Sequence, residues 1–274
     1  MNIRLVSINV WDLPLPLPRF ERRTRRRRLL HQLPMLDADV ILVQEAFVPG
    51  FRHELRAALP TYHVDALVAS RRRPLLLRMD GAGGLMVFSR WPVGRTVFEP
   101  SRPFRFMKPD ERVGRKGCLW TELATPAGGL VVGNVHLYAG NRRSDARARS
   151  RQTRQIVEQH PFEPAAPTVL AGDFNMAREV EDTGGPPTGI DIMEEAGYKE
   201  VAGARSDGIA TKAPSVNRYA RISPWPQTDR RLTQVFLRGP GLAPGPEPPR
   251  LCLDAEPVSD HFGLMVTLSF GPPA

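Results

Sequence analysis

Short apolar segments rich in Val, Ile and Leu recur along the whole chain, and they constrain its fold more than any other feature. Runs of this kind and length are typical of buried β-strands. We expect strands near residues 2–10, 38–44, 62–68, 84–90, 94–98, 117–124, 130–137, 167–172, 232–237 and 262–269. Helical patterns are fewer, near residues 20–33, 51–59, 145–160 and 189–196. Strands and helices mixed over residues 1–274 favour a single α+β domain.

The composition excludes several classes of protein. With 41% hydrophobic and 24% charged residues, the chain resembles ordinary globular proteins rather than disordered ones. No apolar run approaches the roughly 20 residues that cross a bilayer, and the N-terminus lacks a signal-peptide pattern. Two cysteines, Cys118 and Cys252, are too few for a disulfide framework or a four-thiolate zinc site. We therefore expect a cytoplasmic monomer with no transmembrane segment, although the mature part of a secreted precursor would look the same.

The charge of the chain is strongly basic, at +9, with 38 basic and 29 acidic residues. Only four of the basic residues are lysines, so 34 are arginines. Arginine binds phosphate in a bidentate manner, which suits an anionic substrate or surface. A genomic bias that also enriches Ala, Pro and Gly explains the count equally well. The charge alone therefore does not decide the function.

Five of the expected strands begin or end with acid, amide or histidine side chains. They are INVWD with Asn9, LVQEA with Glu45, GNVHL with Asn134 and His136, GDFN with Asp173 and Asn175, and SDH with Asp260 and His261. A polar group at the end of a buried strand is costly unless it is paired or used. Any one of them could be a satisfied core group. Five together indicate a functional site.

The oxygen ligands in this set suit a hard divalent cation. Glu45, Asn9 and Asp260 favour Mg²⁺, Mn²⁺ or Ca²⁺ over Zn²⁺. Asp260 is adjacent to His261, so both can face one site only if their segment is irregular. These features predict a metal-assisted hydrolase.

The remaining side chains suit the hydrolysis of a phosphoester. Asp173 and Asn175 lie two residues apart, so an extended backbone directs both to one face. There the acid can hold a water and the amide can donate to a phosphoryl oxygen. His136 and His261 can serve as phosphate donor and as general acid or base near neutral pH.

The motifs NVWD, QE, NVHL, GDFN and SDH, in this order, resemble those of the endonuclease/exonuclease/phosphatase superfamily from about Asn2 to Phe270. The resemblance implies a four-layer α/β/β/α sandwich of two mixed, largely antiparallel β-sheets flanked by helices. It implies that Asn9 and Glu45 bind the catalytic metal, with Asp260 touching it. Mg²⁺ is the expected ion, with Mn²⁺ or Ca²⁺ as alternatives.

The same resemblance implies a role for each remaining motif residue. Asp173 would orient or activate the attacking water. Asn175 and His136 would hold the phosphate. His261 would act as the general base or its charge partner.

Looser segments resemble the sphingomyelinase-like branch of the superfamily. They are NVWDLP, GGLMVFSRWPV and FMKPDERVGRKGCLWTEL. On this resemblance, Asn134, Lys116 and Asp110 would contact the substrate. The expected function is a Mg²⁺-dependent phosphodiesterase that releases a phospholipid head group. The alternatives are a DNA or RNA nuclease of the same superfamily and a weakened domain that only binds phosphate or membranes.

One position departs from the superfamily pattern. An acid in a strand shortly before the last motif usually orients the catalytic histidine, and Thr233 stands in its place. A neutral hydroxyl cannot stabilise an imidazolium as a carboxylate does. We expect either that Asp229, four residues upstream, substitutes for it or that activity is reduced.

Two further segments suggest contact with nucleic acid or a membrane. Residues 19–28 contain seven arginines, although a solvated helix face explains such a run more often. Residues 71–77 join three arginines to three leucines, which suits a peripheral membrane contact, and Trp225 lies in a Pro-rich stretch. Ordinary packing is the alternative for both.

Overall fold

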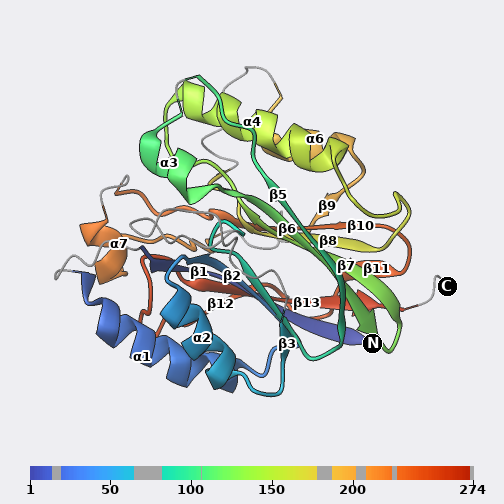
Figure 1. The fold of residues 1–274 in the computed structure, drawn as a ribbon, viewed down its shortest axis with the longest axis horizontal. Helices are drawn as coiled ribbons and strands as arrows, with labels where there is room; N and C mark the ends of the chain where they lie inside the picture. The colour runs from blue at the N-terminus through green and yellow to red at the C-terminus, as the bar shows by residue number, and fades with distance from the viewer. Residues whose placement is uncertain are drawn as a thin grey trace.

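The structure is a computed structural model that describes residues 1–13, 20–64, 82–105, 107–177, 187–201, 208–223 and 227–271. Two β-sheets pack face to face, and helices cover the outer side of each (Figure 1). Among the strand pairs of the described residues, β1–β2 and β7–β8 are parallel and the others are antiparallel. The expected four-layer sandwich of mixed, largely antiparallel sheets is confirmed.

The strands of the first sheet run in the spatial order β11 (Leu242–Pro244), β13 (Gly263–Phe270), β1 (Asn2–Asp12), β2 (Val40–Ala46), β4 (Met86–Ser89) and β3 (His63–Val64), with β12 (Arg250–Cys252) also paired to β13. The second sheet has the order β5 (Val93–Pro100), β6 (Gly117–Thr125), β7 (Gly128–His136), β8 (Thr168–Asp173), β10 (Thr233–Arg238) and β9 (Lys199–Glu200).

The helices divide between the two outer faces. Against the first sheet lie α1 (Arg22–Gln32), η2 (Leu33–Leu36) and α2 (Pro49–Ala58), and against the second lie α4 (Arg143–Glu158) and α6 (Gly189–Glu195) (Figure 1). Two short helices, α3 (Pro109–Gly114) and α7 (Arg218–Ile222), lie toward one end of the sandwich (Figure 1). None of the described helices has the length and hydrophobicity needed to cross a membrane.

Strand β1 shows how the layers are held together. Successive side chains of a strand point to opposite faces. Ile3 and Leu5 therefore pack in the core between the sheets, whereas Ile8 and Val10 pack in the core beneath α1 and α2. A third core lies between the second sheet and the helices α4 and α6.

Close approach of backbones requires glycine at one position near the site. A Cβ atom on Gly172 would lie 2.0 Å from the carbonyl oxygen of Val135 on the paired strand. Glycine thus allows β7 and β8 to run together directly before Asp173.

Most expected elements are present, and the differences concern short ones. The sequence did not predict the short elements α3, α7 and β11. Helix α4 is rich in arginine, and yet it buries Arg149 and Gln152.

Part of the arginine run is structural. Arg25 is buried, and Arg26 forms an ion pair with Asp12 at 2.8 Å. Residues 71–77 and Trp225, considered above as membrane contacts, lie outside the described residues.

Candidate active site

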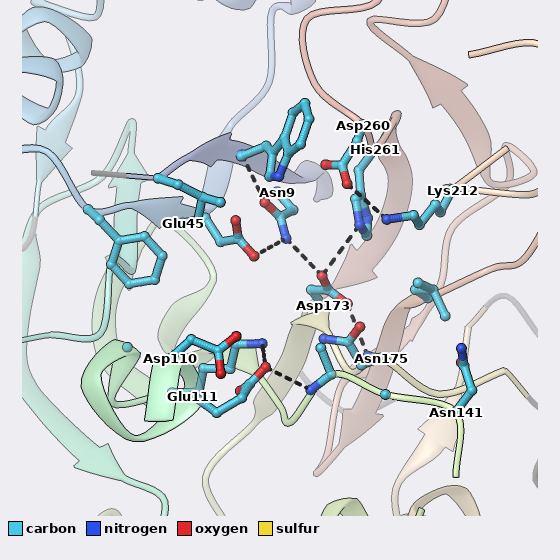
Figure 2. A pocket seen from close by; sticks show the side chains of 18 of the residues that line it. Asn9, Glu45, Asp110, Glu111, Asn141, Asp173, Asn175, Lys212, Asp260 and His261 are labelled. Carbon is cyan, nitrogen blue, oxygen red and sulfur yellow. Dashed lines mark hydrogen bonds and ion pairs between the residues drawn. The ribbon is translucent and has the colours of Figure 1, made fainter. Parts of the chain in front are cut away.

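A cleft of about 540 Å³ opens where β1, β2 and β8 end, beside the segment that precedes β13. Figure 2 shows the side chains that these elements direct toward it. Eight of the ten predicted site residues line the cleft: Asn9, Glu45, Asp110, Lys116, Asp173, Asn175, Asp260 and His261. Asn134 and His136 do not line it.

The backbone is unusual at three of these strand ends. Trp11, Glu45 and Asn175 have φ angles of 49°, 60° and 51°, in the left-handed region that non-glycine residues rarely adopt. The β1–β2 register also shifts between Asn9 and Asp12. Strained backbone of this kind occurs often at functional sites.

The segment that carries Asp260 and His261 is irregular, as both residues require in order to face one site. It lies before the first residue of β13, and both side chains line the cleft.

Asn9 links the two carboxylates at the centre of the cleft. Its Nδ2 donates to Glu45 Oε1 at 3.1 Å and to Asp173 Oδ2 at 2.9 Å (Figure 2). Its Oδ1 accepts from the backbone N–H of Trp11 at 3.0 Å. The backbone N–H of Asn175 donates to Asp173 Oδ1 at 3.0 Å. The predicted water-orienting acid and its neighbours therefore form one network.

Glu45 has a strongly shifted pKa. Burial, together with the carboxylate of Asp260, raises this pKa to about 7 against the opposing charge of Lys116. Its Oε2 atom is buried and has no hydrogen-bond partner among the described residues. A buried carboxylate oxygen without a partner is costly, and such an oxygen is suited to bind a cation.

Both histidines approach the same carboxylate oxygen of Asp173. Nε2 of His136 lies 3.7 Å from both Glu45 Oε1 and Asp173 Oδ2, and Nε2 of His261 lies 3.9 Å from Asp173 Oδ2. Burial, with Lys116 and the other imidazole, holds the pKa of His136 well below its usual range. Burial also lowers the pKa of His261, although Asp173 and Asp260 oppose that shift.

The two histidines differ in access to the cleft. His261 lines it, and its neutral imidazole can accept a proton there. His136 is fully buried and does not line the cleft, so the prediction that it holds the phosphate is not supported. It lies within reach of the carboxylates instead.

Asp260 is paired with a lysine that the sequence analysis did not single out. Nζ of Lys212 donates to Asp260 Oδ2 at 2.8 Å and to Ser223 Oγ at 3.1 Å. Burial would raise the pKa of Asp260, but Lys212 and His261 outweigh it and lower that pKa. The carboxylate expected to touch the metal is therefore engaged by an ammonium group.

Asn134 contacts the opposite sheet rather than the substrate. Its Nδ2 donates to the carbonyl oxygens of Val43 and Met86, at 2.9 and 2.8 Å, and its Oδ1 accepts from Gln44 at 2.8 Å. It is fully buried and away from the cleft. The structure therefore does not support the prediction of Asn134 as a substrate-binding residue.

The other two predicted substrate contacts lie on one wall of the cleft. Asp110 is exposed at the start of α3. Lys116 is buried and pairs with Glu111 at 2.9 Å. Burial alone would lower the pKa of Lys116, but Glu111 and Glu45 raise it, so this lysine remains charged.

The position where an acid was expected is neutral and inaccessible. Thr233 pairs with Asp173 across β10 and β8, and its Oγ1 is buried without a partner among the described residues. Nδ1 of His261 is also buried and unpartnered there. Asp229 does not compensate, because its carboxylate accepts from the backbone N–H and the hydroxyl of Ser215 at the surface.

Comparison with known proteins gives the family. The family model described as Endonuclease/Exonuclease/phosphatase family matches residues 6–261. This chain belongs to that family. The chain has no significant sequence match among curated proteins.

Solved structures of other proteins share the endonuclease/exonuclease/phosphatase fold at low sequence identity. Sphingomyelinase C from Streptomyces griseocarneus superposes with a TM-score of 0.68 at 18% identity, covering 97% of this chain and 99% of that one. D. rerio TDP2, complexed with a single-strand DNA product, gives 0.70 at 20% identity, covering 98% and 99%. Beta toxin from Staphylococcus aureus, in a mutant with bound magnesium ions, gives 0.70 at 18% identity, covering 99% and 100%.

The residues of the endonuclease/exonuclease/phosphatase site fit a hard cation with few protein ligands. Among the described residues, no group of three or more His, Cys, Asp or Glu side chains is arranged to hold a metal. Mg²⁺ commonly keeps several waters and uses only one or two carboxylates. The free Oε2 of Glu45 matches that requirement. Asn9 directs its amide nitrogen at the carboxylates, so its oxygen would reach a cation only after the amide turns.

The sequence analysis missed several residues that line the cleft. They are Trp11, Phe47, Glu111, Lys212 and Arg230. Lys212 carried one available signal, since it is one of four lysines in an arginine-rich chain. Trp11 stands in the NVWD motif and Glu111 in one of the looser segments, although neither had been given a role. Phe47 and Arg230 carried no signal, because only the fold brings them to the cleft.

Proposed function

We propose that this protein is a divalent-metal-dependent phosphodiesterase, with Mg²⁺ as the ion, that hydrolyses a phosphoester by in-line attack of water. The observation that carries the proposal is the convergence in one cleft of Glu45, with its free buried oxygen, and the pair Asp173 and His261. Mg²⁺ bound at Glu45 and Asn9 would polarise a phosphoryl oxygen.

The roles of the protein side chains follow from their contacts. Asp173 accepts from Asn9 and from the Asn175 backbone, which fixes its carboxylate for orienting a water. His261 is the group that takes the proton from that water. Asn175 uses one amide hydrogen on the carbonyl of Leu137 at 3.0 Å, and its second remains for a phosphoryl oxygen.

A phospholipid head group is the first candidate for the substrate. Apolar side chains also line the cleft, among them Trp11, Leu13, Phe47 and Val113. They suit the lipid side of a phosphodiester, and sphingomyelinase C is among the proteins of similar fold. The limited sequence likeness to the sphingomyelinase-like branch supports the same choice.

A nuclease is the second candidate. Its support is the net charge of +9 and the similar fold of TDP2 in complex with a single-strand DNA product. A protein that binds phosphate or membranes with little turnover is a third, and Thr233 in place of an acid is its support.

A Mg²⁺-dependent turnover assay, run in parallel on sphingomyelin micelles and supercoiled plasmid, tests the proposal. We expect head-group release that is abolished in Glu45→Gln and in His261→Ala. Plasmid nicking abolished by both changes would instead make the protein a nuclease, with the same site. Activity that survives both changes would show that the site is misassigned, and a lack of turnover of either substrate would favour the binding role.

A further inference from the structure

Lys212 and Asp260 form a buried ion pair inside the cleft. Their side chains are 6% and 3% exposed, and Nζ lies 2.8 Å from Oδ2. Removing two charges from water is costly unless further hydrogen bonds satisfy them. The hydroxyl of Ser223, 3.1 Å from Nζ, provides one such bond.

The backbone around Lys212 places its side chain in the site. The carbonyl of Thr211 accepts from the N–H of Phe262 at 2.7 Å. The N–H and C=O groups of Lys212 exchange hydrogen bonds with Arg230, at 3.0 and 2.8 Å. The segment is thus held between the His261 loop and the residues that lead into β10. Its position is fixed and not that of a mobile surface lysine.

The ammonium group has a donor left for a ligand. It carries three N–H bonds, of which two are used on Asp260 and Ser223 in the described part of the chain. Lys212 lines the cleft together with Asp173 and His261. In Figure 2 it lies on the opposite side of Asp173 from Glu45.

The acidic lining of the cleft makes a cationic donor necessary for binding an anion. The acidic residues that line it would repel an anionic substrate; they are Glu45, Asp110, Glu111, Asp173 and Asp260. Lys116 already pairs with Glu111. Lys212 neutralises Asp260, on the side away from Glu45. The replacement of the expected acid by Thr233 removes a further negative charge.

We propose that Lys212 binds a phosphoryl oxygen of the substrate and that Asp260 is its counter-ion rather than a metal ligand. The inference rests on the proposed function, since it assigns two residues of the same cleft. It divides the cleft into a cation side at Glu45 and an anion side at Lys212.

The metal half of the inference is tested by calorimetric titration of Mg²⁺ into three proteins. We expect Glu45→Gln to lose Mg²⁺ binding and Asp260→Asn to bind within twofold of the wild type. The asparagine oxygen can still accept from Lys212, so this variant should fold. A tenfold or larger loss of Mg²⁺ affinity in Asp260→Asn would overturn the inference.

The anion half is tested by titrating inorganic phosphate into metal-free protein in EDTA. The variant is Lys212→Met combined with Asp260→Asn, which leaves no buried charge unpaired. The control is Lys199→Met, an exposed lysine on β9. We expect phosphate affinity to fall at least tenfold in the double variant and to stay unchanged in the control. Equal affinity in wild type and double variant, or no phosphate binding by the wild type, would overturn the inference.

Neither titration requires turnover, so the two proposals can fail separately. If the wild type hydrolyses no phosphodiester but both titrations give the expected results, the anion subsite stands and the phosphodiesterase does not. If turnover is found, Lys212→Met with Asp260→Asn should lower kcat by about 10²–10³-fold, the range for loss of one donor to a transition-state oxyanion.

Discussion

Glu45 is held by the fold in a place that favours its neutral form. Its backbone is left-handed, its Oε2 atom has no partner among the described residues, and burial raises its pKa to about 7. A residue so placed destabilises the metal-free protein when it is ionised. A role in binding a cation therefore explains the placement of Glu45, whereas a contribution to the stability of the metal-free protein does not.

Replacement of Glu45 by Gln should stabilise the metal-free protein at alkaline pH. The folded protein retains the Glu45 proton up to about pH 7, whereas the unfolded chain loses it near 4.5. The contribution of Glu45 to stability therefore decreases as the pH rises between these values, by up to about 3 kcal/mol. Urea unfolding in EDTA should give Glu45→Gln a higher unfolding free energy than the wild type at pH 8 and an equal one at pH 5.

Magnesium provides the control for that experiment. Saturating Mg²⁺ at pH 8 should raise the unfolding free energy of the wild type and leave Glu45→Gln unchanged. A Glu45→Gln protein that is no more stable than the wild type at pH 8 without metal would show that the ionised Glu45 does not destabilise the fold.

Thr233 leaves an unsatisfied pair of atoms where the superfamily pattern has an acid. Its Oγ1 and the Nδ1 of His261 are both buried without a partner in the described residues. Restoring the acid with Thr233→Asp should leave kcat/KM equal or raise it, because a carboxylate stabilises the imidazolium. Thr233→Asn, a neutral variant of similar size, is the control. A large loss of activity in Thr233→Asp, with an unchanged circular dichroism spectrum, would count against this correspondence.

At the scale of elements, the strands were predictable and the short connecting pieces were not. Strands such as β1, β2 and β8 bury both faces, so their apolar runs are visible in the sequence. Helices α3 and α7 have six and five residues, too few for a helical period to emerge. Because α3 provides one wall of the cleft, the Glu111–Lys116 pair could not be foreseen.

Helix α1 is rich in arginine, and one of its arginines, Arg25, has a structural role. Arg25 donates to the carbonyl oxygens of Phe20, Val10, Trp11 and Val258, at 2.8 to 3.2 Å. It therefore ties the start of α1 to the end of β1 and to the loop before Asp260. In the sequence, Arg25 cannot be distinguished from its exposed neighbours Arg23 and Arg27. The run of arginines predicted a solvent-exposed helix face, but Arg25 is buried and holds the segments that carry site residues.

For the whole molecule, the site depends on how the two sheets are aligned. Glu45 ends a strand of the first sheet and Asp173 ends a strand of the second, so a shift between the sheets would separate them. Apolar packing alone does not fix such a register tightly. Asn134 of β7 does so, with its hydrogen bonds to Val43 and Met86 across the interface. Its place in a motif marked it as a site residue, whereas its contacts make it a link between the sheets, because sequence cannot distinguish a buried link from a ligand.

Asn134→Ala should therefore weaken both stability and activity. It removes a hydrogen-bond donor from the carbonyl groups of Val43 and Met86, which costs about 2–6 kcal/mol of unfolding free energy at about 1–3 kcal/mol for each unsatisfied group. Nε2 of Gln44 loses one partner but keeps Ser7 and Leu42. Urea unfolding of Asn134→Ala, compared with that of Asn2→Ala, a variant at an exposed asparagine on β1 of the first sheet, measures the difference. The loss of kcat at saturating Mg²⁺ should exceed any change in KM, because Glu45 and Asp173 lose their alignment while the apolar side chains of the cleft remain. An unfolding free energy within about 0.5 kcal/mol of the wild type, the range of ordinary surface substitutions, would show that packing alone aligns the sheets.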